Sequence, residues 1–87
     1  MTAAIPEVLL IEDEASVRLA TAQALELAGI AVASFATAED ALPAIGAEFA
    51  GVVLSDVRLP GMSGMALLDE AGRRDRDLPV ILVTGHG

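Results

Sequence analysis

Apolar runs of strand length alternate with stretches of helical length along this chain. The four runs cover residues 8–12, 30–35, 52–55 and 78–84. This alternation is typical of βαβ units, in which helices cover both faces of a parallel sheet. We therefore predict an α/β fold with four parallel strands. The first run is apolar until it ends in acid, which is typical of a central strand that is buried on both faces.

Two of the intervening stretches carry the pattern of a helix with one inward face. The first covers residues 15–28 and stops at Gly29, which suits a left-handed helix end. Its predicted inner face is formed by Val17, Ala20, Ala24 and Leu27 or Ala28. The second covers residues 64–74, and its predicted inner face is formed by Met65, Leu68 and Ala71.

Between these two helices, a further helix is predicted to start at Thr37 and to be short or distorted. Thr37 is a suitable N-terminal cap for the residues that follow it. Pro43 lacks an amide donor and clashes with the preceding turn, and Gly46 weakens the helix further.

Composition narrows the function classes. The 87 residues are 54% apolar and 21% charged, which favours a folded domain over a disordered chain. They contain no Cys, which excludes disulfides, thiol nucleophiles and cysteine metal sites. The net charge of −8 disfavours direct binding to nucleic acid or to an anionic membrane. The apolar runs are far shorter than the roughly 20 residues of a membrane span, so we expect a cytoplasmic protein.

Polar side chains lie at the carboxyl ends of three of the predicted strands. Glu12 and Asp13 follow the first strand, Asp56 the third, and Thr84 ends the fourth. The carboxyl ends of parallel strands meet at one sheet edge, where function concentrates in open α/β sheets. Neighbouring carboxylates repel one another unless a cation lies between them, and hard oxygen ligands suit Mg²⁺ or Mn²⁺. Asp56 is the candidate nucleophile for attack on a phosphorus centre.

Taken together, these acids, the Pro60-Gly61 turn and Thr84 resemble a response regulator receiver domain of two-component signalling. The resemblance covers residues 8–87 and implies a flavodoxin-like sheet, here with strand order 2-1-3-4 and helices on both faces. Within the family, the chain is most similar to receivers of C4-dicarboxylate transport regulators and σ54-dependent transcription regulators. The resemblance therefore implies that the chain is a phosphoprotein that controls transcription through a phosphorelay.

The resemblance also implies a role for each matching residue. Asp56 would accept a phosphoryl group from a sensor histidine kinase, and Glu12 and Asp13 would bind Mg²⁺ beside it. The backbone carbonyl of Arg58 would complete the metal ligands. Thr84 would be the switch hydroxyl that moves toward the phosphoryl oxygens.

Two departures from the family pattern stand out. The family's conserved lysine has no counterpart, because the chain contains no Lys. The sequence also offers nothing from which the fourth helix, the fifth strand and the fifth helix could form. We therefore expect residues 1–87 to be a single, incomplete receiver domain. Its exposed sheet edge at residues 78–84 would favour self-association or a homodimer.

Two other functions stay open at this point. An aspartyl-nucleophile phosphatase or phosphotransferase would use a related sheet, but such enzymes usually carry a second Asp two residues after the nucleophile, where this chain has Arg58. A fragment that binds a kinase without being phosphorylated is the other alternative. We interpret the chain as a signalling module rather than an enzyme.

Overall fold

The computed structural model describes residues 5–46 and 49–83. In chain order, the elements are β1 (Val8–Ile11), α1 (Ala15–Leu27), β2 (Val32–Phe35), α2 (Ala38–Ala41), the 3₁₀ turn η1 (Leu42–Ala44), β3 (Val52–Asp56), α3 (Gly64–Arg74) and β4 (Val80–Val83). The four strands form one parallel sheet in the order β2-β1-β3-β4. The predicted fold class, strand number and strand order are confirmed.

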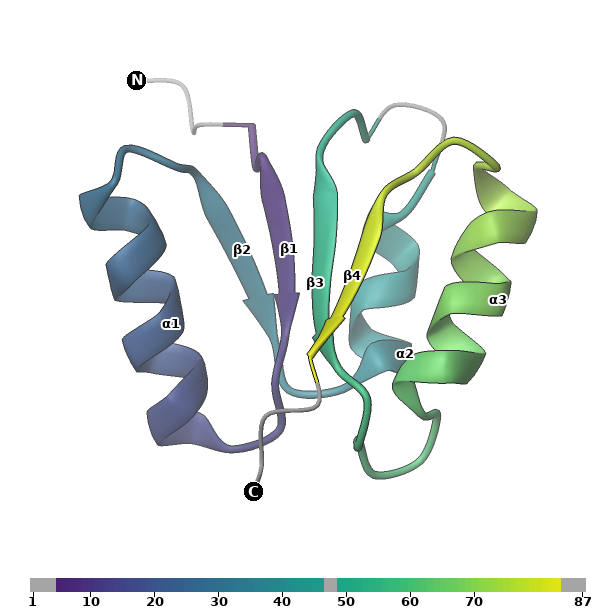
Figure 1. The fold of residues 1–87 in the computed structure, drawn as a ribbon, viewed down its shortest axis with the longest axis horizontal. Helices are drawn as coiled ribbons and strands as arrows, with labels where there is room; N and C mark the ends of the chain where they lie inside the picture. Colours follow the sequence, from purple (N-terminus) through teal and green to yellow (C-terminus); the bar gives the residue numbers. More distant parts are fainter. Residues whose placement is uncertain (1–4, 47–48, 84–87) are drawn as a thin grey trace.

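The two faces of the sheet are covered unequally. Figure 1 shows α1 on one side and α2 and α3 on the other. Strand side chains alternate between faces, so Leu9 and Val53 point toward α2 and α3 and are fully buried there. On the other face α1 packs mainly against β1 and β2. Ile81 and Val83 of β4 are 53% and 45% exposed, because no helix among the described residues covers them.

The second helix is short, as predicted. Thr37 Oγ1 accepts a hydrogen bond from the amide of Asp40 (3.1 Å), which caps α2. After Ala41 the chain tightens into η1, which contains Pro43. Gly29 has a φ of +85° after α1, which also matches the prediction.

The predicted inner face of α1 is wrong at most positions. Val17 is half-buried as expected, but Ala20, Ala24 and Ala28 are exposed, and Leu27 is 89% exposed. The half-buried row instead continues from Val17 through Thr21 and Leu25. The methyl group of Thr21 can pack like an apolar side chain. The prediction missed Thr21 because it considered only apolar residue types, and Thr carries a hydroxyl.

The predicted inner face of α3 is wrong at two positions and right at Ala71. Met65 and Leu68 are exposed, and Leu67 is fully buried in their place. The reason lies at Gly64, where an added Cβ would lie 2.5 Å from the carbonyl oxygen of Asp56. This close backbone approach turns Gly64 toward β3, and Leu67 follows one turn later on the same face.

None of the helices in the described part of the chain is long and apolar enough to cross a membrane.

Candidate functional site

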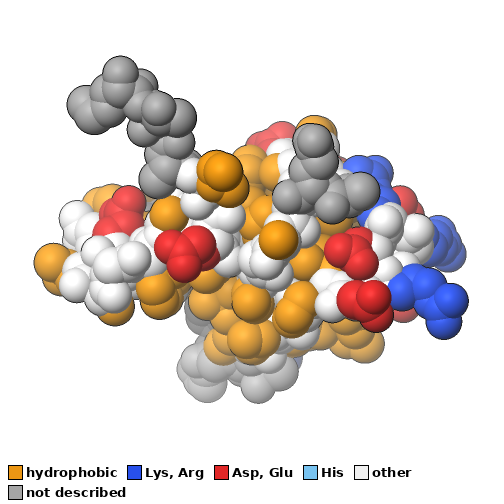
Figure 2. Space-filling view, turned by 90° about the horizontal axis from the view of Figure 1, so that it is seen from above, with side chains coloured by type: hydrophobic (Ala, Val, Ile, Leu, Met, Phe, Trp, Pro, Cys, Tyr) orange, Lys and Arg blue, Asp and Glu red, His pale blue; other side chains and the backbone are white. Residues whose placement is uncertain are grey.

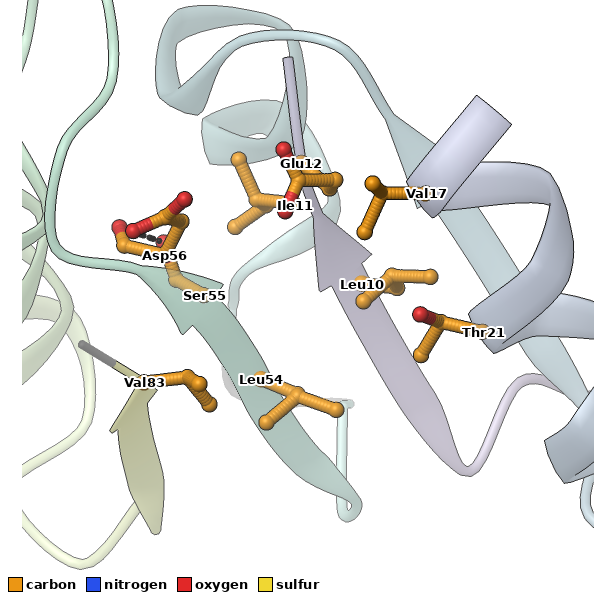
Figure 3. A pocket seen from close by; sticks show the side chains of 9 residues that line it. All are labelled: Leu10, Ile11, Glu12, Val17, Thr21, Leu54, Ser55, Asp56 and Val83. Atoms are coloured by element: carbon orange, nitrogen blue, oxygen red, sulfur yellow. Dashed lines mark hydrogen bonds between the residues drawn. The ribbon is translucent and has the colours of Figure 1, made fainter. Parts of the chain in front are cut away.

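Three acidic side chains meet at the carboxyl edge of the sheet. Ile11 of β1 pairs with Ser55 of β3, so the residues that follow them end neighbouring strands at the same level. Glu12, Asp13 and Asp56 each offer a carboxylate oxygen, and these oxygens lie within 4.8 Å of one another. Glu12 and Asp56 are only 7% and 6% exposed, whereas Asp13 is exposed. Figure 3 shows Glu12 and Asp56 at adjoining strand ends.

The Glu12 side chain is held by the start of α1. Its Oε2 accepts a hydrogen bond from the amide of Glu14 at 3.1 Å, and Glu14 is the N-cap residue of α1. The N-terminal end of a helix carries partial positive charge, which favours an ionised carboxylate. The amide of Glu14 therefore fixes the direction of the Glu12 carboxylate.

The Asp56 carboxylate is oriented by the loop that follows β3. The amide of Arg58 donates to Asp56 Oδ1 at 3.0 Å. Ser55 Oγ donates to the carbonyl oxygen of Asp56 at 2.9 Å, and the amide of Gly64 donates to the carbonyl of Val57 at 3.0 Å. Both ends of the loop are thus tied to the end of β3.

A small cavity lies beside the carboxylates on the α1 face of the sheet. Its volume is about 190 Å³, and apolar side chains of β1, β3, β4 and α1 form most of its wall, with Glu12 and Asp56 at its rim (Figure 3). Apolar walls lower the local dielectric constant, so charges at the rim interact more strongly than they would in open water.

A second, shallower hollow lies on the solvent side of the acids. It measures about 230 Å³ and is lined by Asp13, Glu14, Asp56 and Arg58. Asp56 can therefore be reached from solvent across a surface that is lined by two further acids and by Arg58.

Of the predicted site residues, the structure brings together Glu12, Asp13, Asp56 and Arg58. Thr84 lies outside the described residues. Sequence reasoning missed two contacts around the site. Arg18 donates to the backbone of the β1–α1 loop, and Glu39 accepts from the amide of Met62 in the loop after β3 at 3.2 Å. Neither contact leaves a motif, because each joins a side chain to a backbone group.

The donor set fits a hard divalent cation. Three carboxylates offer only oxygen ligands, which is the preference of Mg²⁺ and Mn²⁺. Two of the three are buried, where negative charge is costly. A small, hydrated cation of charge two would offset that cost.

Comparisons with known proteins agree on one family. The family profile of the response regulator receiver domain matches residues 8–87. The C4-dicarboxylate transport transcriptional regulatory protein DctD of Rhizobium meliloti is 55% identical over 84 residues, which cover 97% of this chain and 18% of that protein. The DNA-binding transcriptional regulator NtrC of Salmonella typhimurium is 38% identical over 79 residues, which cover 91% of this chain and 17% of that protein. The chain thus spans less than a fifth of the length of these relatives.

Solved structures show the same fold. A CheY-like response regulator receiver domain from Methanospirillum hungatei is 33% identical with a TM-score of 0.85, covering 97% of this chain and 67% of that one. The structure titled FixJ-N is 36% identical with a TM-score of 0.80, covering 100% and 68%.

Proposed function

Because the chain belongs to the response regulator receiver family of two-component signalling, we propose that Asp56 accepts a phosphoryl group from a sensor histidine kinase. The observation that carries this proposal is the meeting of three carboxylates within 4.8 Å at the ends of β1 and β3. Glu12, Asp13 and Asp56 would hold Mg²⁺, and the backbone carbonyl of Arg58 would complete its protein ligands.

The transfer is a substitution at phosphorus. One carboxylate oxygen of Asp56 forms a bond to phosphorus while the bond between phosphorus and the kinase imidazole nitrogen breaks. The product is an acyl phosphate on Asp56, and the imidazole leaves after gaining a proton. The amide of Arg58 orients the Asp56 carboxylate through Oδ1 for this attack. A bound divalent cation supplies positive charge that offsets the charge on the carboxylates and on the transferred group.

The readout of phosphorylation would be a change at Thr84, whose hydroxyl can donate to a phosphoryl oxygen. The curated relatives are named as transcriptional regulators, which supports a role of this chain in transcription control as the receiver part of a longer protein. In that role the chain takes up and passes on a signal without turnover of a substrate, and DNA contacts belong to other segments. We place this activity in the cytoplasm.

The test is an intact-mass measurement of the purified chain after incubation with acetyl phosphate and MgCl₂. The wild-type chain should gain one phosphoryl mass. The Asp56→Asn variant should gain none, and Asp69→Asn, which removes a carboxylate from the exposed side of α3, should behave as the wild type. Borohydride reduction followed by peptide mapping locates the acyl phosphate. A gain that persists in Asp56→Asn overturns the assignment.

A further inference from the structure

Arg18 joins α1 to the loop that carries two of the three acids. Its Nη1 donates to the carbonyl oxygen of Glu12 at 2.8 Å and lies 3.4 Å from the carbonyl oxygen of Asp13. We propose that Arg18 is a positioning residue for the divalent cation site. The inference rests on the proposed function, because it concerns the Mg²⁺ that Glu12, Asp13 and Asp56 would hold.

The two contacts act on consecutive peptide units. Only Glu12, Asp13 and Glu14 connect β1 to α1, so this loop is short. At Glu12 the amide donates to the carbonyl of Phe35 in β2 at 3.0 Å, and the carbonyl accepts from Arg18. The backbone of Glu12 is thus fixed from both sides. Since the direction of a side chain follows from its backbone, Arg18 also sets where the two carboxylates point.

Arg18 differs in placement from the arginines of α3. Arg73 and Arg74 pair with Glu70 on the helix surface, and Figure 2 shows the blue side chains of that face gathered at one end of the molecule. Arg18 is half-buried and contacts backbone carbonyls. A planar guanidinium with several fixed donors suits such a bridge better than the compact ammonium of lysine.

The charge of Arg18 and its positioning role predict opposite effects on cation affinity. A guanidinium close to the site repels Mg²⁺, so a residue that acted only through its charge would weaken binding, and its removal would tighten it. A residue that holds the carboxylates in place strengthens binding, and its removal weakens it. The sign of the change therefore separates the two roles.

The experiment measures Mg²⁺ affinity by calorimetry for the wild-type chain, Arg18→Gln, Arg18→Lys and the control Arg73→Gln. Arg73→Gln removes the same charge from an exposed pair. We expect Arg18→Gln to bind Mg²⁺ about tenfold more weakly. Arg18→Lys should fall between Arg18→Gln and the wild type, and Arg73→Gln should stay within about twofold of the wild type.

A second readout needs no metal. Hydrogen exchange followed by NMR without Mg²⁺ should show faster exchange of the Glu14 amide in Arg18→Gln, because this amide bonds the Glu12 carboxylate. Amides of β1 and β3 should keep their protection and show that the variant is folded. If Arg18→Gln does not fold, the Mg²⁺ affinity of Arg18→Lys decides between the two roles. Lysine keeps the positive charge, so weaker Mg²⁺ binding in this variant would come from a change in the position of the carboxylates.

Affinity in Arg18→Gln that equals or exceeds that of the wild type overturns the inference, as does unchanged affinity in Arg18→Lys when that variant decides. A wild-type chain that does not bind Mg²⁺ at all instead overturns the proposed function. The two failures are therefore distinguishable.

Discussion

Ile11 and Ser55 are register partners in the parallel pairing of β1 and β3, one residue before Glu12 and Asp56. This register brings two buried acids to the same level of one sheet edge. A slip of one residue would turn the side chains of a strand to the opposite faces of the sheet and separate the two carboxylates. The proposed metal site thus depends on the pairing of two short strands, and contacts that fix the position of β3 should support it.

Gly64 makes one such contact with the end of β3, and replacing Gly64 tests whether this contact matters. A Cβ at position 64 would lie 2.5 Å from the carbonyl oxygen of Asp56, so the backbone must shift. We expect Gly64→Ala to lower the free energy of unfolding by about 1–3 kcal/mol. Gly72→Ala on the same helix is the matched control, because nothing lies within 4 Å of its added Cβ, and it should stabilise the chain by about 0.5–1 kcal/mol. Urea unfolding measures both, and equal effects would contradict the packing described here.

Sequence patterns predicted the sheet and the acidic edge well, because both follow from where apolar runs stop. The bounds of α3 agree with the prediction, because Ser63 caps its first turn and its last turn ends in arginines. The inward positions of α3 were not predictable, because the approach of Gly64 to Asp56 sets the rotation of the helix. Arg18 and Glu39 were missed for a related reason: a bond to a distant backbone group leaves no spacing in the sequence.

Glu39 should hold the loop that follows Asp56. Its Oε2 accepts from the amide of Met62 at 3.2 Å and would lie 2.6 Å from a Cβ at Gly61, so the carboxylate lies directly on the turn. Glu39→Ala should speed hydrogen exchange of the Met62 amide and lower stability by about 0.5–1.5 kcal/mol. Asp40→Ala is the control, because it removes the neighbouring charge while its own amide can still bond Thr37. If both variants exchange equally at Met62, Glu39 has no special role.

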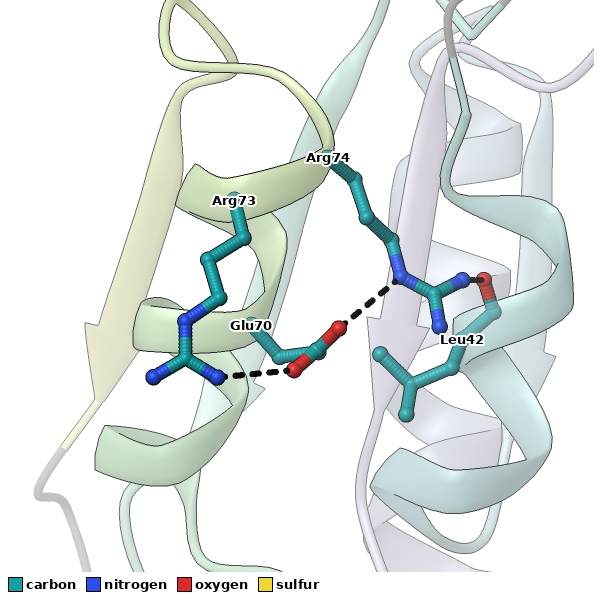
Figure 4. A network of polar contacts seen from close by, with 4 residues as sticks. All are labelled: Leu42, Glu70, Arg73 and Arg74. Carbon is teal, nitrogen blue, oxygen red and sulfur yellow. Dashed lines mark hydrogen bonds and ion pairs between the residues drawn. The ribbon is translucent and has the colours of Figure 1, made fainter.

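Arg74 should stabilise the fold more than Arg73. Arg74 Nη1 donates to the carbonyl of Leu42 at 2.8 Å and its Nε lies 3.3 Å from Glu70, whereas the Arg73 side chain is 77% exposed and pairs with Glu70 at 3.5 Å (Figure 4). Arg74→Ala removes the link between α3 and η1. We expect a loss of about 1 kcal/mol for Arg74→Ala and of less than about 0.5 kcal/mol for Arg73→Ala in urea unfolding. The reverse order would contradict the network.

The exposed edge at β4 should promote self-association. Ile81 and Val83 are 53% and 45% exposed, and within the described part of the chain β4 pairs only with β3. Light scattering after gel filtration should show a mass that rises with protein concentration. Ile81→Lys should reduce this rise, because a charged residue on an edge strand opposes pairing with another chain. A monomeric mass at all concentrations would contradict the predicted self-association.

One divalent cation should bind between Glu12, Asp13 and Asp56. Mn²⁺ titration followed by electron paramagnetic resonance counts bound ions directly in the wild type, Asp13→Asn, Asp56→Asn and Asp69→Asn. We expect one ion per chain in the wild type and in Asp69→Asn, with much weaker binding in Asp13→Asn and Asp56→Asn. A wild-type chain that binds no ion, or an affinity that does not change in Asp56→Asn, would contradict it.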